Sequence, residues 1–202
     1  MRVALDRICA AIAADGVAVE ADFLPQSTIA ALTHEAHARD AAGEFHSAGI
    51  GRGAAHMMRS DVRGDRILWI DESAPGSAER PFWQAFDALR LALNETLQLG
   101  LFSFEAHYAL YPPGASYGRH LDRFRAGADS PDVRVISCAI YLTVDWTPAD
   151  GGVLRIHDGE RMRDVLPLAG KLVCFLSDRF EHEVLPATRE RLSLTGWFRR
   201  RA

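Results

Sequence analysis

Residues 191–198 read Arg-Leu-Ser-Leu-Thr-Gly-Trp-Phe, and this stretch indicates how the second half of the 202-residue chain folds. Successive side chains of a β-strand point to opposite faces, so alternate positions belong together. One face is leucine-rich, and the other carries four polar or aromatic side chains: Arg191, Ser193, Thr195 and Trp197. Such a strand fits a core on one side and a polar pocket on the other. The simpler alternative is an edge strand whose polar face lies in water.

Further short apolar runs precede this stretch, at 104–111, 133–143, 153–156, 171–176 and 182–185. Turn-forming glycines and prolines separate them, at 112–114, 150–152, 157–159 and 169–170. Many short strands separated by turns are typical of a closed or double-sheet β structure such as a jelly roll. We therefore expect residues 101–202 to form a β core.

The first hundred residues have a helical pattern. Apolar side chains recur at helical spacing over 3–14, 27–39 and 80–99, and a short strand is predicted at 17–19. The stretch 43–66 has no clear periodicity, which is typical of a functional or a disordered loop. We expect one domain over 1–202, of the α+β class but mainly β, with the helices packed outside one sheet and 43–66 as a mobile loop.

The composition excludes some classes of partner. A net charge of −4 gives no general attraction to nucleic acid or to an anionic membrane. No apolar run has the length of a membrane span. Charges at Asp6 and Arg7 argue against a secretory signal. Of three cysteines, Cys138 and Cys174 lie in strand-like apolar runs, which indicates reduced core thiols in a cytoplasmic protein.

Three side chains form a candidate metal site. His120 and Asp122 are two residues apart, so on a strand both side chains project from one face. His182 belongs to a later predicted strand. Two imidazoles and one carboxylate form the facial triad of non-haem Fe(II) oxygenases, which leaves the opposite face of the metal open. The alternative for each histidine is a surface position or a hydrogen-bonded place in the core.

Arg191 is a candidate for binding the far carboxylate of a keto acid. Its planar guanidinium can hold a carboxylate through two parallel hydrogen bonds. Arg191 lies nine residues after His182, which predicts that the two lie on adjacent antiparallel strands. Tyr141 lies in a nearly continuous apolar run, where its hydroxyl needs a partner that such a carboxylate could provide. Tyr111 and Tyr117 are further candidates for the pocket wall, with core packing as the alternative.

The segment from Tyr111 through Tyr117 to Asp122 resembles the iron-binding segment of the prolyl hydroxylase-domain group of Fe(II)/2-oxoglutarate dioxygenases. The resemblance covers roughly residues 15–200. It continues through further segments of the chain: 63–70, 141–146, 151–156, 177–179, 182–186 and 191–197.

This resemblance implies a double-stranded β-helix with supporting N-terminal helices. It also implies roles for individual residues. His120, Asp122 and His182 would ligate Fe(II). Arg191 and Tyr141 would hold the C5 carboxylate of 2-oxoglutarate, with Tyr111 near the other end of that co-substrate and Thr195 and Trp197 in the pocket wall. Asp65 and Arg134 match charged positions of the group, and we expect them to pair and to anchor the 43–66 loop. Trp69 and His107 are expected near the substrate.

The expected activity is hydroxylation of a prolyl residue in a protein or peptide, with 2-oxoglutarate converted to succinate and CO2. The cofactors would be Fe(II), 2-oxoglutarate and O2, with ascorbate as a candidate stimulant. Two alternatives stay open: a hydroxylase of a free amino acid or small metabolite, and a non-catalytic module that binds a metal or 2-oxoglutarate. The chain departs from the group in the segment 123–132 and in the loop 43–66, which we expect to decide the target.

Overall fold

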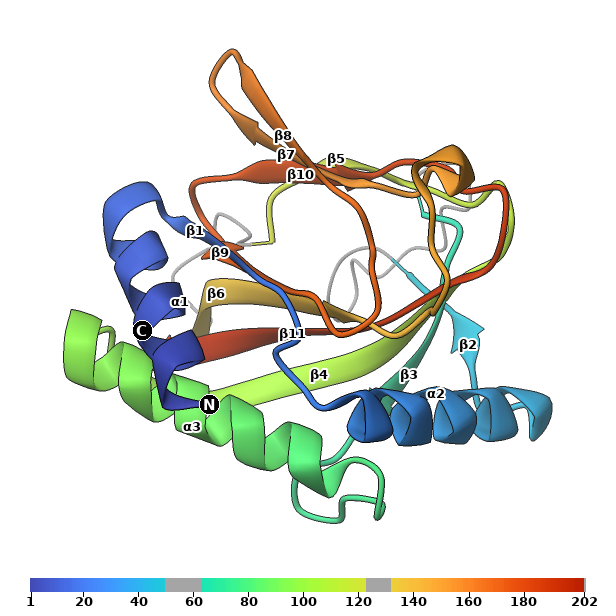
Figure 1. Cartoon of the computed structure of the whole chain (residues 1–202), viewed down its shortest axis with the longest axis horizontal. Coiled ribbons are helices and arrows are strands. Elements are labelled where there is room, and N and C mark those ends of the chain that lie inside the picture. Colours follow the sequence, from blue (N-terminus) through green and yellow to red (C-terminus); the bar gives the residue numbers. More distant parts are fainter. Residues whose placement is uncertain (50–62, 123–131, 202) are drawn as a thin grey trace.

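The computed structural model describes residues 1–49, 63–122 and 132–201. Two antiparallel sheets face each other, and three helices cover the outer face of the larger sheet (Figure 1). The helices are α1 (Arg2–Asp15), α2 (Gln26–Ala41) and α3 (Arg80–Leu97), with a short 3-10 helix η2 (Pro148–Asp150). The expected jelly-roll core with N-terminal helices outside one sheet is confirmed.

The larger sheet has seven strands in the order β1-β9-β6-β11-β4-β3-β2. Their bounds are β1 (Val17–Glu20), β9 (Leu172–Leu176), β6 (Asp132–Tyr141), β11 (Arg191–Arg201), β4 (Leu101–Tyr111), β3 (Arg66–Ile70) and β2 (His46–Ser47). The smaller sheet has the order β5-β10-β7-β8. Its strands are β5 (Tyr117–His120), β10 (Glu181–Val184), β7 (Leu154–Asp158) and β8 (Arg161–Val165).

Strand β11 is central to the larger sheet, between β4 and β6. Its apolar face packs against the helices, where Phe198 lies 4.5 Å from Phe104 between ring centroids and Phe86 lies 4.7 Å from Phe104. Its other face looks toward the smaller sheet. The close approach of β4 requires Gly196, because a Cβ atom there would lie 2.5 Å from the Glu105 carbonyl oxygen.

One expectation about β11 is wrong. It does not pair with the strand of His182, because β10 pairs with β5 and β7 in the smaller sheet. The chain between His182 and Arg191 crosses from one sheet to the other. Arg191 and His182 therefore approach the same space from opposite walls, instead of lying side by side.

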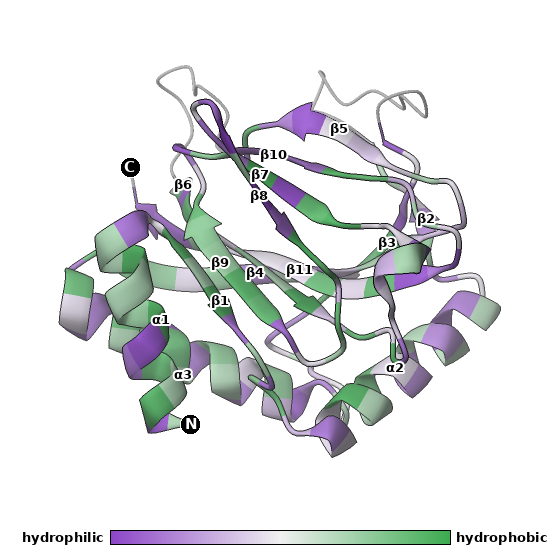
Figure 2. Cartoon of the chain, turned by 45° about the horizontal axis from the view of Figure 1, so that its top comes forward, coloured by the Kyte–Doolittle hydropathy of each residue, from purple (hydrophilic) through white to green (hydrophobic). Residues whose placement is uncertain are grey.

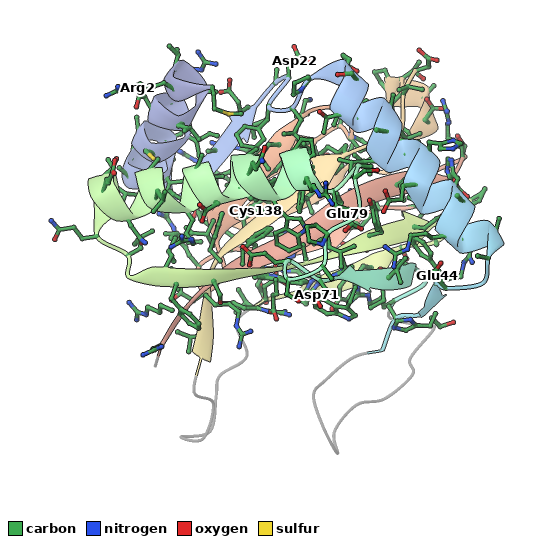
Figure 3. The ribbon with its side chains drawn as sticks, turned by 90° about the horizontal axis from the view of Figure 1, so that it is seen from below. Arg2, Asp22, Glu44, Asp71, Glu79 and Cys138 are labelled. Carbon is green, nitrogen blue, oxygen red and sulfur yellow. The ribbon has the colours of Figure 1, made fainter. Side chains whose placement is uncertain are left out.

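The helices are tied to one another by charged groups under the larger sheet. Seen from that side, α2 and α3 lie across the sheet, and Glu79 lies at the start of α3 (Figure 3). The Arg39 Nη1 atom of α2 donates to Glu79 Oε1 at 3.1 Å. Strand β8 lies at the edge of the smaller sheet; it is hydrophilic, and four of its five residues are exposed (Figure 2).

Candidate active site

A cavity of about 350 Å³ lies between the two sheets. This volume is within the range of small-molecule binding sites, roughly 300–1,000 Å³. The larger sheet contributes to its wall through β3, β4, β6 and β11, and the smaller sheet through β5, β7 and β10. The wall includes the three candidate metal ligands and Arg191.

The candidate metal ligands converge on one point. His120 ends β5 and is the register partner of His182 on β10. The Nε2 atom of His120 lies 3.5 Å from Asp122 Oδ1, and the Nε2 atom of His182 lies 3.4 Å from Asp122 Oδ2. One ligand atom from each residue falls within 4.8 Å of the others. The spacing had predicted that Asp122 lies on the same strand as His120. Asp122 instead lies two residues beyond the end of β5.

Backbone carbonyls fix the orientation of both imidazoles. The Nδ1 atom of His120 lies 2.8 Å from the Gly118 carbonyl oxygen, and that of His182 lies 3.2 Å from the Phe180 carbonyl oxygen. A carbonyl can only accept, so each Nδ1 carries the proton and donates it. The lone pair of each Nε2 is then free for a metal, which is the usual tautomer of a metal-binding histidine.

The charges at this point also suit a cation. Burial lowers the pKa of His182 to about 4, so its imidazole is neutral near pH 7. Burial alone raises the pKa of Asp122, but His182 and His120 lower it more, and the net shift is downward. The neutral imidazole of His182 and the carboxylate anion of Asp122 therefore line the same side of the cavity as His120.

Arg191 is a buried cation without an acidic partner. It is 3% exposed, and its Nε atom donates to the Gly152 carbonyl oxygen at 3.0 Å. No ion pair joins it to a carboxylate in the described part of the chain. A buried charge without a counterion is strongly unfavourable, which indicates that an anion binds here. Gly152 allows the close approach, since its φ is +65° and a Cβ atom would lie 3.4 Å from Arg191 Cδ.

Two tyrosines surround this guanidinium. Its Cζ atom lies 4.9 Å from the Tyr141 ring centroid and 5.2 Å from that of Tyr111. The Tyr141 hydroxyl is buried, and no described residue forms a hydrogen bond with it. Burial raises the pKa of both tyrosines, so both hydroxyls keep their protons and can donate. Arg191 and these hydroxyls form a set of donors that fits one carboxylate of a dicarboxylic acid.

The wall beside this donor set is made by the polar face of β11. Thr195 and Trp197 line the cavity, as the alternation of the strand predicted. Thr195 Oγ1 lies 3.5 Å from Ser193 Oγ. The edge-strand alternative is wrong, because β11 lies inside the sheet with partners on both sides.

The expected pair of Asp65 and Arg134 is not present among the ion pairs of the described residues. Arg63 holds Asp65 instead, with Nε–Oδ1 at 2.6 Å and Nη2–Oδ2 at 2.9 Å. Arg134 donates from Nε to Glu105 Oε1 at 2.8 Å. Residues two apart on an extended chain share a side, so Arg63 reaches Asp65 without a long-range contact. Neither Arg63 nor Glu105 was predicted as a site residue, although Arg63 lies two positions from the predicted site residue Asp65.

An aromatic group lines the other part of the cavity. Trp69 of β3 and His107 of β4 are register partners, and their ring centroids lie 4.8 Å apart. Trp197 lies 5.4 Å from His107. The Arg134 guanidinium covers the Trp197 ring at 3.5 Å. All four of these side chains line the cavity, and their roles toward a substrate stay predictions.

Two expected substrate-facing segments lie largely outside the described residues. They are 50–62 within the loop 43–66, and 123–131 with Arg123, Arg125, Asp129, Ser130 and Pro131. Among the helices of the described ranges, none is long and apolar enough to cross a membrane.

A β core with a His-Asp-His cluster and a buried, acid-free arginine in one cavity defines a candidate 2-oxoglutarate oxygenase site. The model of the 2OG-Fe(II) oxygenase superfamily matches residues 106–199, which contain all three clustered ligands and Arg191. The chain belongs to this superfamily.

Within this superfamily, the chain is similar to several prolyl hydroxylases and their relatives. The crystal structure of a prolyl-4-hydroxylase from Pseudomonas putida is 47% identical, with a TM-score of 0.87 over 98% of this chain and 100% of that one. Human Egl nine homolog 1 is 29% identical over 98% of this chain and 47% of its own length. A Trichoplax adhaerens prolyl hydroxylase in complex with a hypoxia-inducible factor peptide is 24% identical and shares the fold, with a TM-score of 0.84 over 98% of this chain and 89% of that one. The chain spans about half the length of the mammalian relatives it matches.

Proposed function

We propose that this chain is an Fe(II)- and 2-oxoglutarate-dependent dioxygenase that hydroxylates a prolyl residue in a protein or peptide, with formation of succinate and CO2. One observation carries the proposal. Arg191 is a buried cation without an acidic partner in the described ranges, and it lines the same cavity as the three-ligand cluster. A metal alone would leave this cation unexplained. A keto acid with a second carboxylate satisfies both halves of the cavity.

In this proposal His120, Asp122 and His182 hold Fe(II) through Nε2, a carboxylate oxygen and Nε2. Three protein ligands leave positions open for a co-substrate, whereas structural zinc prefers four protein ligands in a closed site. The bound iron, with 2-oxoglutarate and O2, supplies the oxidising chemistry. The protein positions the reactants, and the two sheets exclude water around them.

Arg191 and the Tyr141 hydroxyl bind the C5 carboxylate of 2-oxoglutarate. Tyr111 donates from the adjoining wall, and Thr195 and Trp197 complete that side. Both tyrosine hydroxyls keep their protons because burial raises their pKa, so they can act as donors to an anion. A planar fork at Arg191 gives the carboxylate a single orientation.

The substrate class rests on the comparisons. The Pseudomonas putida enzyme that this chain matches over its whole length is a prolyl-4-hydroxylase. The chain is also similar to human Egl nine homolog 1 and to a Trichoplax adhaerens prolyl hydroxylase. On that basis we propose that the substrate of this chain is a prolyl residue. Asp65 and Arg134 belong to charged pairs near the cavity, and Trp69 lies at its exposed edge.

We further propose that 1–202 act as one catalytic domain, with 101–202 supplying most of the site. A cytoplasmic location is also proposed. It is supported by three buried free cysteines, since thiols persist in reducing compartments.

The test is anaerobic loading with Fe(II) and 2-oxoglutarate, followed by O2, ascorbate and a pool of proline-containing peptides. We expect succinate and peptides heavier by one oxygen atom. His182→Ala and Arg191→Ala should abolish both. Modification of free proline but of no peptide would favour the small-metabolite alternative. Tight binding of metal and 2-oxoglutarate without any turnover would favour a non-catalytic module.

A further inference from the structure

His107 is a buried polar residue in the cavity wall for which neither the iron nor the 2-oxoglutarate assignment has a use. It lies on β4 between two register partners, Trp69 on β3 and Thr195 on β11. The residue is 1% exposed, and neither Nδ1 nor Nε2 has a hydrogen-bond partner among the described residues. Most buried polar side-chain atoms in proteins are hydrogen-bonded, so two unsatisfied nitrogens on one ring need an explanation.

The described residues in contact with the His107 ring are aromatic. Its ring contacts both Trp69 and Trp197, which also lie 6.2 Å apart, and the Trp197 indole nitrogen is buried without a hydrogen-bond partner in the described part of the chain. The nearby cations already have acids, since Arg63 binds Asp65 and Arg134 binds Glu105. Burial, with help from the Arg63 and Arg134 charges, lowers the pKa of His107 well below its usual value. The imidazole is therefore neutral, with one donor and one acceptor nitrogen.

This environment fits a neutral backbone group better than a charged one. A free amino acid would bring an ammonium and a carboxylate, and the carboxylate would need an unpaired cation. A peptide brings amides. The prolyl nitrogen has no N–H, so the backbone groups that flank a prolyl ring at its own amide are carbonyl oxygens, which only accept. The exposed indole of Trp69, 44% accessible and in contact with His107, provides a surface along which such a peptide can pack.

We propose that His107 is a specificity-determining residue that donates a ring N–H hydrogen bond to a backbone carbonyl oxygen of the substrate, beside the target proline. This inference rests on the proposed function. It adds a contact that selects an X-Pro-X peptide over free proline.

The test compares His107→Met, which removes the donor, with His107→Asn and His107→Gln, which place an amide N–H near Nδ1 and Nε2 respectively. The substrates are capped peptides with a single central proline, and free L-proline. With His107→Met, kcat/KM for the peptides should fall roughly 10- to 100-fold. Succinate formation without peptide, and the Kd for 2-oxoglutarate, should change by less than about twofold. One of the two amide variants should recover activity and so identify the donating nitrogen.

A second pair of measurements separates this role from a structural one. The Tm of ligand-free His107→Met should equal or exceed that of the parent protein, because the substitution removes an unsatisfied buried polar group. Peptides with a thiocarbonyl, a weaker acceptor, on either side of proline should slow the parent enzyme at one of the two positions and leave His107→Met unaffected there.

Equal peptide kcat/KM in the parent protein and His107→Met would overturn the inference and leave the proposed function standing. So would a lowered Tm with no rescue by either amide, which would assign His107 to the fold. A parent protein that forms no succinate with any substrate would instead overturn the proposed function.

Discussion

Replacing Arg191 by Met removes the buried guanidinium and keeps an unbranched, apolar side chain in its place. The far carboxylate of 2-oxoglutarate then loses two charge-assisted hydrogen bonds. Each is worth about 1.5–3 kcal/mol, or about 3–6 kcal/mol together. At about 1.4 kcal/mol for each factor of ten, the Kd should rise roughly a hundredfold to ten-thousandfold. Arg191→Lys should recover only part of this loss, since an ammonium cannot reproduce the planar fork.

The assay is calorimetric titration of 2-oxoglutarate into Fe(II)-loaded protein without oxygen, with metal content measured in the same sample. Arg189→Met is the matched control, because Arg189 lies two residues away, is partly exposed, and donates to the Asp145 carbonyl oxygen at 3.0 Å. The control should bind 2-oxoglutarate like the parent protein. The free energy of unfolding of ligand-free Arg191→Met should be unchanged or higher, since an uncompensated buried charge is removed. A Kd within about threefold of the parent value would refute this assignment of Arg191.

Three further outcomes follow from the geometry. In chelator-treated protein, lowering the pH from 7 to 4 should reduce the free energy of unfolding by about 3 kcal/mol through His182. The pKa of His182 is 6.5 in the unfolded chain and about 4 in the folded one, so the unfolded chain binds the proton first. Urea unfolding across this pH range checks the prediction, and the free energy of unfolding of His182→Asn should depend less steeply on pH than that of the parent protein. Asp65→Asn should lower the free energy of unfolding by about 3–5 kcal/mol, because it leaves buried Arg63 without its carboxylate. Asp164→Asn, which breaks the exposed pair with Arg155, should lower it by less than about 1 kcal/mol. Equal losses for the two variants in urea unfolding would contradict the burial argument. Gly152→Ala places a Cβ atom 2.9 Å from Ala187 Cβ and from Trp146, so it should lower Tm and weaken 2-oxoglutarate binding. The control is Gly159→Ala, which has a similar φ of +63° but whose Cβ atom meets nothing within 4 Å, and it should leave 2-oxoglutarate binding intact.

Much of the fold could be predicted because burial leaves a periodic record in the sequence. Strand β11 has two buried faces of different chemistry, and its alternation predicted both the apolar contacts of Phe198 and the pocket positions of Thr195 and Trp197. The helix α3 was predicted for the same reason, since Phe82, Phe86 and Leu89 share a buried face. Strand β8 was missed because only Val165 of its five residues is buried, so no alternation marks it.

The parts of the site that could not be predicted depend on which sheet each strand joins. The spacing of His182 and Arg191 predicted a turn between two strands, but a spacing does not say whether the second strand stays in the same sheet. The pairing of Asp65 failed for a related reason. Its choice between Arg63 and Arg134 is settled by local chain geometry and by Glu105, which takes Arg134 across the strands.

The measurement that tests the central claim most directly is turnover of a proline-containing peptide under isotopically heavy dioxygen, with Fe(II) and 2-oxoglutarate present. Mass spectrometry should find heavy oxygen in the hydroxylated proline and in succinate, in equal amounts and only while His120, Asp122 and His182 are intact. Oxygen derived from water in the peptide product, or labelled product from the Asp122→Ala variant at the parent rate, would contradict the account.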